Sequence, residues 1–294
     1  MKGRLAMKYT ANYIGKKTRL QRIMGKDNKC LIVPLDDNLI SGTQTGIESI
    51  INKLEQIEKV KPNAIMAYQG TLSEMEDFSI PKILNLSAST IRRNHTKKVL
   101  VSDVEYALKM GADAVAVHVN VSSQYESEML ETLGKTSEIC DIYGMPLLVI
   151  IYPRREKIDS VGNVIDDNYL KQKESNNVDY QELVCHCVRI AFEMGADIIK
   201  TQYTGSTESF ANVVKSANDC PVIIAGGPIM EIKELFKMVE DSIFAGAAGV
   251  SIGRNIFSRS RSDVIIPCIK DIIYKKSTFE QVLLHYEQEV LNNS

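Results

Sequence analysis

Short, continuously apolar runs rich in Val, Ile and Leu recur along the chain. Eight of them have the length of a strand, and they lie at 30–35, 64–68, 81–86, 114–119, 146–152, 197–203, 221–225 and 248–252. A strand that is apolar at every position, rather than at alternate positions, is covered on both faces, as is typical of parallel sheets. The pattern therefore predicts eight buried parallel strands.

Stretches with the helical spacing of apolar residues separate most of these runs, at 46–60, 101–111, 126–144, 180–195, 208–219 and 232–246. Strands that alternate with helices predict either an open, doubly wound sheet or a closed barrel. Eight strands favour the closed form, and 294 residues suit one domain of this kind. We therefore predict an α/β protein with a single (β/α)8 TIM barrel.

A short motif repeats before the fourth, sixth and eighth runs. It reads GADAV at 111–115, GADII at 195–199 and GAAGV at 246–250. Glycine readily adopts the left-handed conformation that ends a helix, so each copy predicts a helix that stops where a strand begins. The repeat supports the strand count of a barrel.

Some regions fall outside the alternation of strands and helices. Residues 1–28 are basic and polar, and we expect an N-terminal arm or helix across the bottom of a barrel domain that spans 29–275. We expect a C-terminal helix over 276–294. Residues 154–179 form a polar insertion after the fifth strand, on the face where barrels carry their active sites. Both a mobile lid and a solvated loop fit this insertion.

The overall composition narrows the classes of partner. The chain has 35 basic and 37 acidic residues, so no broad cationic surface for nucleic acid is expected. No apolar run approaches the ~20 residues of a membrane-spanning helix, and the N-terminus lacks the apolar stretch of a signal peptide. The six cysteines are scattered and mostly lie in apolar segments. We therefore expect a cytoplasmic protein with reduced thiols and no membrane partner.

Lys200 interrupts the sixth apolar run near its C-terminal end. Barrels carry their catalytic residues at these strand ends, and a buried ammonium is costly to hold. Burial and nearby cations lower the pKa of a lysine, and the neutral amine can attack a carbonyl to form a Schiff base. A lysine paired with a buried carboxylate is the structural alternative.

Other candidate catalytic residues end the first and fifth runs. Asp36 and Asp37 follow the first, and Tyr152 ends the fifth. A carboxylate can move protons while an imine forms, and a tyrosine hydroxyl can exchange a proton with a substrate oxygen. Singly, an Asp is also a good helix cap and a Tyr a common strand residue. Their placement at one end of a barrel favours a catalytic role.

The seventh and eighth runs end in glycine-rich turns that predict a phosphate site. Gly226 and Gly227 follow the seventh run, and Gly253 and Arg254 follow the eighth. Glycines let backbone N–H groups approach an anion, and these two loops are the usual phosphate site of a barrel. The guanidinium of Arg254 would add a charged donor.

The histidines do not predict a metal centre. The four of them fall in four separate segments, whereas a zinc-dependent mechanism needs several at one site. His118 ends the fourth run, where both a donor that lines the pocket and a hydrogen-bonded core histidine fit it.

Five segments of the chain resemble a known family. They are ADAVAVHVN, GMPLLVIIYPR, GADIIKTQYTGSTESF, VIIAGGP and AGAAGVSIGRNIF. In order and spacing they are similar to the class I aldolases that group archaeal-type fructose-bisphosphate aldolase with 2-amino-3,7-dideoxy-D-threo-hept-6-ulosonate synthase. The resemblance runs from about Leu31 to Phe257.

The resemblance implies a role for each matching residue. Lys200 would form the Schiff base, Tyr152 would donate or accept the proton, and Asp36 would assist at the imine. The substrate phosphate would lie against Gly226, Gly227, Gly253 and Arg254. The resemblance implies no cofactor other than the covalent lysine imine, and a homo-oligomer, commonly a decamer in this family.

The chain departs from the family pattern on the substrate side. The family usually has Asp-His-Gly where this chain has Asp36-Asp37-Asn38, and His-Lys-Gly where it has Tyr68-Gln69-Gly70. The family's Tyr-Pro-Arg-Gly has Arg155 in place of its glycine here, and the family's Gly-Gly-Pro-Lys has Ile229 in place of its lysine. We therefore expect Asp37 and Gln69, together with His118, to contact the rest of a different substrate.

Together these features predict a metal-independent class I aldolase or transaldolase. It would make or break a carbon–carbon bond of a phosphorylated ketose, and joining a ketose phosphate to an amino-acid-derived aldehyde in a biosynthetic pathway fits the departures. The alternatives are a glycolytic or gluconeogenic fructose-bisphosphate aldolase and a non-catalytic barrel that binds a phosphosugar. A decarboxylase or isomerase would leave Lys200 and Tyr152 without a clear role.

Overall fold

The eight predicted runs all form strands of one barrel. The computed structural model describes residues 11–25, 27–92, 95–162, 164–171 and 177–291. The barrel strands are β1 (Cys30–Pro34), β2 (Ala64–Ala67), β3 (Lys82–Asn85), β6 (Ala114–Val121), β7 (Leu147–Ile158), β9 (Ile198–Thr201), β10 (Val222–Ala225) and β11 (Gly249–Ser251).

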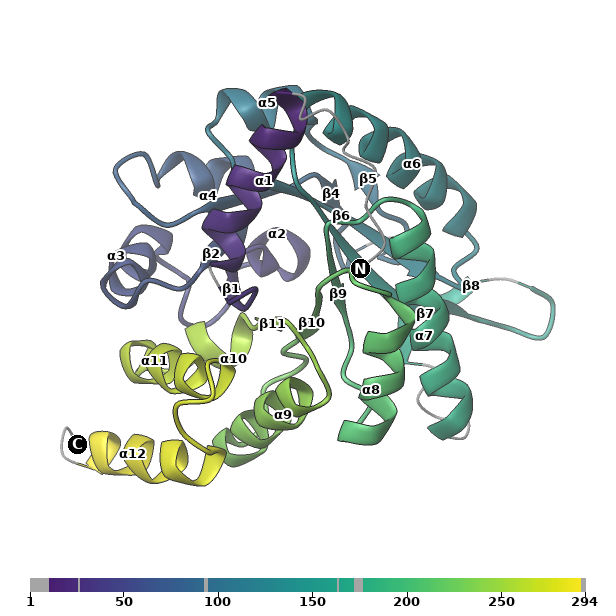
Figure 1. Ribbon diagram of the computed structural model, residues 1–294. Helices are drawn as coiled ribbons and strands as arrows, with labels where there is room; N and C mark the ends of the chain where they lie inside the picture. The colour runs from purple at the N-terminus through teal and green to yellow at the C-terminus, as the bar shows by residue number, and fades with distance from the viewer. Residues whose placement is uncertain (1–10, 26, 93–94, 163, 172–176, 292–294) are drawn as a thin grey trace, which may run out of the picture.

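The barrel is closed. Each of these strands pairs in parallel with its neighbours in the order β6-β3-β2-β1-β11-β10-β9-β7, and a further pairing of β6 with β7 joins the two ends. An open, doubly wound sheet would leave two edges unpaired, so the closing pair excludes it. The predicted (β/α)8 barrel is confirmed (Figure 1).

Helices surround this ring of strands (Figure 1). The longer ones are α3 (Ile50–Val60), α5 (Val104–Lys109), α6 (Glu126–Tyr143), α7 (Asn177–Glu193), α8 (Thr207–Ser216), α9 (Ile232–Phe244), α11 (Ser262–Ile273) and α12 (Phe279–Leu291). Short helices follow three strands directly: α2 (Asp37–Ser41), α4 (Gln69–Ser73) and α10 (Arg254–Phe257). The repeated glycines Gly111, Gly195 and Gly246 all have positive φ, as a helix-ending residue requires.

The strands are apolar at every position because they have two dry faces. In β1, Leu31 and Val33 pack in the layer between strands and helices, whereas Cys30 and Ile32 fill the inside of the barrel. The same interior cluster contains Met66, Ile83, Leu148, Ile150 and Ile223. Side chains of a strand alternate between its faces, so both sets are needed to fill the two layers.

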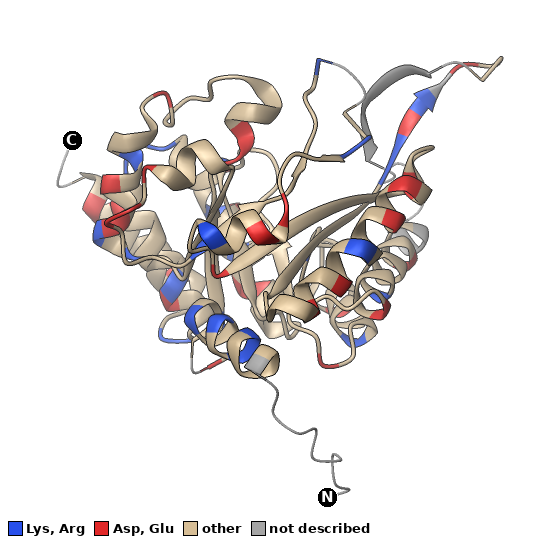
Figure 2. Cartoon of the chain, turned by 90° about the horizontal axis from the view of Figure 1, so that it is seen from above, with Lys and Arg blue, Asp and Glu red and all other residues tan. Residues whose placement is uncertain are grey.

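Helix α1 (Ala11–Met24) covers the N-terminal ends of the strands. Its Ile23 packs into the barrel interior, and the Lys16 Nζ lies 2.9 Å from an oxygen of Asp197, just before β9. The Arg22 Nη1 lies 2.9 Å from an oxygen of Asp113, just before β6. Figure 2 shows α1, with its blue basic residues, at the opposite side of the barrel from the β7–β8 hairpin. The C-terminal ends of the strands therefore remain the accessible end.

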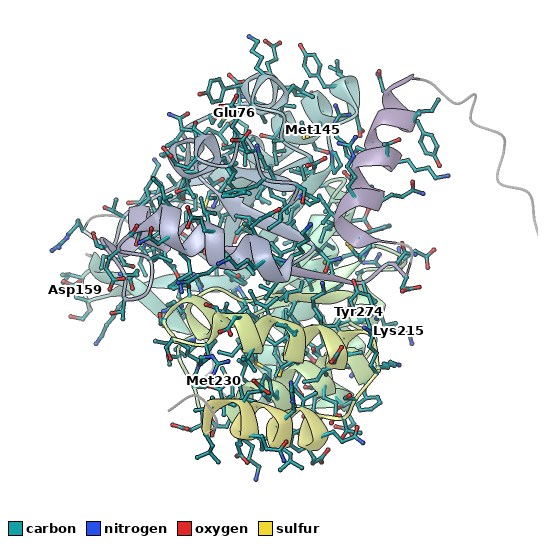
Figure 3. The ribbon with its side chains drawn as sticks, turned by 90° about the vertical axis from the view of Figure 1, so that its left-hand side faces the viewer. Glu76, Met145, Asp159, Lys215, Met230 and Tyr274 are labelled. Atoms are coloured by element: carbon teal, nitrogen blue, oxygen red, sulfur yellow. The ribbon has the colours of Figure 1, made fainter. Side chains whose placement is uncertain are left out.

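The insertion at 154–179 contains strand structure where the sequence predicts a polar loop or a lid. Strand β7 continues to Ile158 and pairs antiparallel with β8 (Val164–Lys171) to make a hairpin. Asp159 marks its turn, far from α1 in Figure 3. Strand β8 reads VIDDNYLK, with polar residues among the apolar ones, so it lacks the continuous apolar run that reveals the barrel strands. Residues 172–176 of the insertion lie outside the described part.

A second short antiparallel pair lies beside β6. It is formed by β4 (Ser87–Ala88) and β5 (Val99–Leu100). Buried Glu156 of β7 accepts hydrogen bonds from Thr96 and Ser123 and from the backbone of Gln124, so the hairpin base, this segment and the loop after β6 are tied together. No helix in the described residues combines the length and apolar character needed to cross a membrane.

Candidate active site

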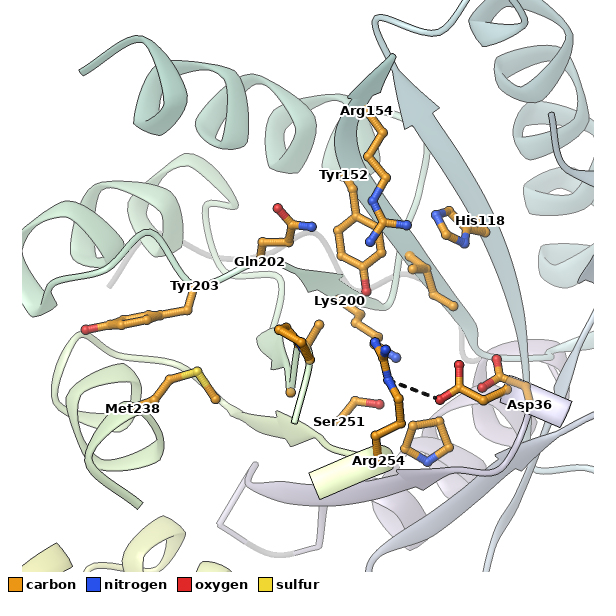
Figure 4. Close-up of a pocket in the computed structure, with 18 of the residues that line it drawn as sticks. Asp36, His118, Tyr152, Arg154, Lys200, Gln202, Tyr203, Met238, Ser251 and Arg254 are labelled. Atoms are coloured by element: carbon orange, nitrogen blue, oxygen red, sulfur yellow. Dashed lines mark ion pairs between the residues drawn. The ribbon is translucent and has the colours of Figure 1, made fainter. Parts of the chain in front are cut away.

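A cavity of about 400 Å³ opens at the C-terminal ends of the strands. Nine of the ten residues singled out from the sequence line it: Asp36, Asp37, His118, Tyr152, Lys200, Gly226, Gly227, Gly253 and Arg254. They come from six different strands or the turns that follow them. The predicted groups are therefore brought together by barrel closure (Figure 4).

Gln69 is the one residue of this set outside the cavity lining. It is the first residue of α4 and is exposed to solvent. Its neighbour Tyr68 is partly buried, and the Tyr68 hydroxyl donates to the carbonyl of Ser87 at 2.8 Å. The turn after β2 thus presents its tyrosine to the barrel and its glutamine to solvent.

Lys200 lies on β9 and is only 7% exposed. Burial lowers its pKa, while the carboxylates of Asp36 and Asp37 act in the opposite direction. In the described part of the chain, no carboxylate oxygen lies within the 4.0 Å of an ion pair with it. A lowered pKa with no carboxylate at ion-pair distance favours the neutral, nucleophilic form of the amine.

Asp36 is held in place by a residue that the sequence reasoning missed. Asn85, at the end of β3, donates its side-chain N–H to the Asp36 Oδ2 at 2.8 Å. The Asn85 Oδ1 also accepts from the backbone N–H of Ser87 at 3.1 Å, which fixes the orientation of the amide. A carboxylate restrained in this way is ordered for proton transfer at the mouth of the barrel.

Tyr152 lies between a histidine and an arginine. Its ring meets that of His118 edge to face, with centroids 5.2 Å apart, and the Arg154 guanidinium carbon lies 4.4 Å from the Tyr152 centroid. Burial, followed by the nearby Lys98 and Arg154, holds the pKa of His118 well below its usual value. The ring is therefore neutral, and its Nε2 lies 3.0 Å from the Asn120 Oδ1.

Two cations in this region were not singled out from the sequence. Arg154 follows Tyr152 by two positions on β7, so strand alternation alone places both side chains on one face. Lys98 is 6% exposed and donates to the Ser89 hydroxyl at 2.5 Å. Burial, with the charge of Arg154, lowers the pKa of Lys98 to about 7. Lys98 follows no barrel strand, so no sequence rule for strand ends could find it.

The glycine turns after β10 and β11 form the other end of the cavity. Asn255 ties them together, because its Nδ2 donates to the carbonyls of Gly226 and Pro228 at 3.0 and 2.8 Å. The N–H groups of Gly227 and Gly253 donate to no acceptor among the described residues. A Cβ on Gly253 would lie 2.8 Å from the Pro34 carbonyl oxygen, so the close approach requires glycine. Free amides at these turns can hold an anion.

Arg254 and Asp37 form an ion pair across this end. The Arg254 Nε lies 3.5 Å from the Asp37 Oδ2, as the dashed line in Figure 4 shows. Burial and the adjacent Asp36 raise the pKa of Asp37, although Arg254 and Lys200 oppose the shift. Among the described residues, no group of three His, Cys, Asp or Glu side chains is arranged to hold a metal ion.

The barrel and this site together define an enzyme of the aldolase class. The chain matches the model of the DeoC/LacD family aldolases over residues 30–259, which is most of its length. The protein belongs to that family.

Similar proteins support the same class. The chain is 35% identical over 275 residues to 2-amino-3,7-dideoxy-D-threo-hept-6-ulosonate synthase 1 of Archaeoglobus fulgidus, covering 92% of this chain and 95% of that protein. It is 32% identical over 266 residues to 2-amino-4,5-dihydroxy-6-oxo-7-(phosphonooxy)heptanoate synthase of Streptomyces griseus, covering 88% and 90%. A solved archaeal fructose 1,6-bisphosphate aldolase superposes with a TM-score of 0.75 at 26% identity, covering 88% and 99%. A related archaeal aldolase structure, with the same similarity and coverage, has its catalytic Lys bound to a carbinolamine intermediate.

Proposed function

We propose that this enzyme joins a phosphorylated ketone donor to an amino-acid-derived aldehyde through an imine on Lys200. The observation that carries the proposal is the buried amine of Lys200, which shares one cavity with Asp36, Tyr152 and the glycine turns. Binding alone needs no buried primary amine of lowered pKa, so this arrangement favours catalysis over a barrel that only binds a phosphosugar.

The residues support a complete and balanced reaction. The neutral Lys200 amine adds to the donor ketone, and protonated Asp36 gives a proton to the resulting hydroxyl, which leaves as water. The Asp36 carboxylate then takes a proton from the adjacent carbon, which leaves an enamine. This carbon attacks the aldehyde, and Tyr152 gives its proton to the aldehyde oxygen. Water hydrolyses the new imine, which releases the product and returns the proton to Tyr152.

The chemical names of the relatives' products indicate the two substrates. In 2-amino-4,5-dihydroxy-6-oxo-7-(phosphonooxy)heptanoate, the bond that an enamine at the ketone can form is C4–C5. Breaking it gives dihydroxyacetone phosphate and 2-amino-4-oxobutanoate. The product name of the Archaeoglobus fulgidus relative has the same amino acid end but is deoxy at position 7. We propose dihydroxyacetone phosphate as the donor for this chain and 2-amino-4-oxobutanoate as the acceptor.

The cations at the β7 side of the cavity suit the acceptor. Arg154 lines the cavity over the ring of Tyr152, and the charge of Arg154 acts on the buried side chain of Lys98. The phosphate turns lie after β10 and β11, so a donor anchored there directs its reactive carbon toward Lys200 and Tyr152. The carboxylate of the acceptor then meets Arg154, whose planar fork matches it.

Reductive trapping tests the proposed function. Incubation with dihydroxyacetone phosphate and borohydride should attach the donor to the peptide that contains Lys200, detected by mass spectrometry. The matched control is the Lys200→Met variant, which should give no adduct. An unmodified Lys200 after trials with several ketose phosphates would refute the imine mechanism.

Arg154→Met should raise KM for 2-amino-4-oxobutanoate by about tenfold or more, because a charge-assisted contact to the acceptor carboxylate is lost. Uncharged propanal should be affected little. The neighbouring Arg155 is exposed, so Arg155→Met is a control with the same change of charge. Steady-state kinetics with both aldehydes measures the effect, and an equal loss with both would contradict the assignment.

We further propose that the enzyme acts in the cytoplasm as a homo-oligomer, without metal or cofactor. Self-association is what the resemblance to the class I aldolases implies, and the chain belongs to the DeoC/LacD aldolase family. Light scattering of the purified protein measures the number of subunits. A monomer in solution would contradict the proposal.

A further inference from the structure

Asp37 introduces a carboxylate into the phosphate end of the cavity. The Asp37 Oδ2 lies 3.5 Å from the Arg254 Nε, and both side chains line the cavity. Among the charged residues that line this cavity, Arg254 is the cation adjoining the glycine turns. Asp37 is therefore paired with the cation that a bound phosphate would need. A phosphate and Asp37 therefore compete for one guanidinium.

Among the described residues, Arg254 is the cation within ion-pair distance of Asp37. Asp36 precedes it in the chain, and Lys200 and Arg254 are the cations that act on it. Tyr68 faces the same pair of carboxylates, but its hydroxyl already donates to Ser87. Asp37 is three-quarters buried, so solvent screens its charge only in part.

We infer that Asp37 adjusts the choice between phosphorylated and uncharged donors. Its charge opposes the phosphate of a donor, and Asp37 takes up a proton when an anion binds beside Arg254. This inference deepens the proposed function, because it concerns the phosphate end of the same cavity. A dianion placed against an ionised Asp37 meets a like charge in a partly buried site. Protonation of Asp37 removes that repulsion and frees Arg254. A donor without a phosphate needs neither the protonation of Asp37 nor the release of Arg254.

The raised pKa of Asp37 supports the coupling. Burial and Asp36 shift the pKa of Asp37 upward, and an added dianion would shift it further in the same direction. As pH rises above the pKa of Asp37, the carboxylate ionises, pairs with Arg254 and weakens anion binding. The affinity of the cavity for an anion should therefore fall as pH rises.

Sulfate tests the inference directly, because it is a dianion that does not itself titrate in this range. Calorimetry of the full chain with sodium sulfate between pH 5 and pH 8, in buffers of different ionisation enthalpy, measures both the affinity and the protons taken up. At pH 8 the Asp37→Asn variant should bind sulfate about tenfold more tightly than the original protein, since one like charge is gone. Its affinity should also depend less on pH.

Two further variants complete the design. Asp37→Ser removes the charge and shortens the side chain, and its affinity for sulfate should rise as that of Asp37→Asn does. Glu231→Gln makes the same change of net charge at an exposed residue outside the cavity lining, and should leave sulfate binding unchanged. Weaker sulfate binding by Asp37→Asn and Asp37→Ser would overturn the inference, because Asp37 would then be holding Arg254 in place for the anion. Unchanged affinity and pH dependence would also overturn it.

A kinetic measurement tests donor choice. In Asp37→Asn at pH 8, the ratio of kcat/KM for dihydroxyacetone phosphate to that for hydroxyacetone should rise about tenfold. An unchanged ratio would contradict the selecting role. Sulfate binding requires no imine, so the calorimetry decides the inference even if the trapping on Lys200 fails and the proposed function is rejected.

Discussion

Replacing Lys200 with Met should abolish turnover, with a loss of kcat of at least about 10⁴-fold, as is found when a covalent nucleophile is removed. Methionine has a similar volume and no nucleophilic nitrogen, so the imine cannot form. Phosphate binding at the glycine turns should remain, because the N–H groups of Gly227 and Gly253 are unchanged. A coupled assay of donor consumption measures the loss.

The same substitution should stabilise the fold, which separates it from a misfolded variant. Burial lowers the pKa of Lys200 below its unfolded value of about 10.5, so the folded state binds fewer protons than the unfolded state. Lys200 therefore lowers the free energy of unfolding at low pH, and this loss shrinks as pH rises toward the pKa of the lysine in the unfolded state. Lys200→Met should melt at a higher temperature than the original protein, with the larger gain at pH 6 than at pH 9.

Inactive but stabilised protein is the expected combination. If Lys200→Met kept measurable turnover, another nucleophile would be in use. If it melted at a lower temperature, the amine would be a structural group rather than a strained functional one. Thermal unfolding at both pH values, alongside the assay, distinguishes these outcomes.

Tyr152→Phe should lower kcat by about 10² to 10⁴-fold while leaving imine formation intact. The phenylalanine keeps the ring that packs against His118 and Arg154, and removes only the hydroxyl. Trapping with borohydride should still label Lys200 in this variant, because Asp36 and the amine form the imine. Carbon–carbon bond formation should be the step that slows.

A tyrosine outside the cavity provides the matched control. Tyr125, which precedes α6, loses its hydroxyl in Tyr125→Phe without any change in the cavity lining. That variant should keep its kcat within about threefold, as expected for a substitution outside the cavity lining. A Tyr152→Phe variant that also failed to trap donor would show that the hydroxyl acts during imine formation instead.

The barrel could be predicted because its signal is local. Each strand is covered on both faces, so each is a continuous apolar run that stands out from the amphipathic helices. The glycines at 111, 195 and 246 mark the helix ends by a conformation that favours glycine. The hairpin of β7 and β8 follows neither rule, and its strands could not be recognised from the sequence.

The site was predictable as far as it lies at strand ends. Asp36 follows β1, Lys200 lies near the end of β9, and Tyr152 lies where β7 leaves its barrel pairing with β6, so a closed barrel brings them to one rim. Gln69 also follows a strand, yet the turn after β2 directs it to solvent. Which way a side chain leaves a turn depends on backbone angles that a strand count does not contain.

The sequence by itself determined the fold class and the position of a lysine in a buried strand, because these depend on the local hydrophobic pattern and on one charge in an apolar run. Only the tertiary structure decided which polar and charged side chains interact. Asn85 reaches Asp36, Lys98 lies near Arg154, and Asp37 pairs with Arg254 across residues distant in the chain. Electrostatic interactions depend on distance and burial in three dimensions, and neither is encoded in the spacing of residues along the chain.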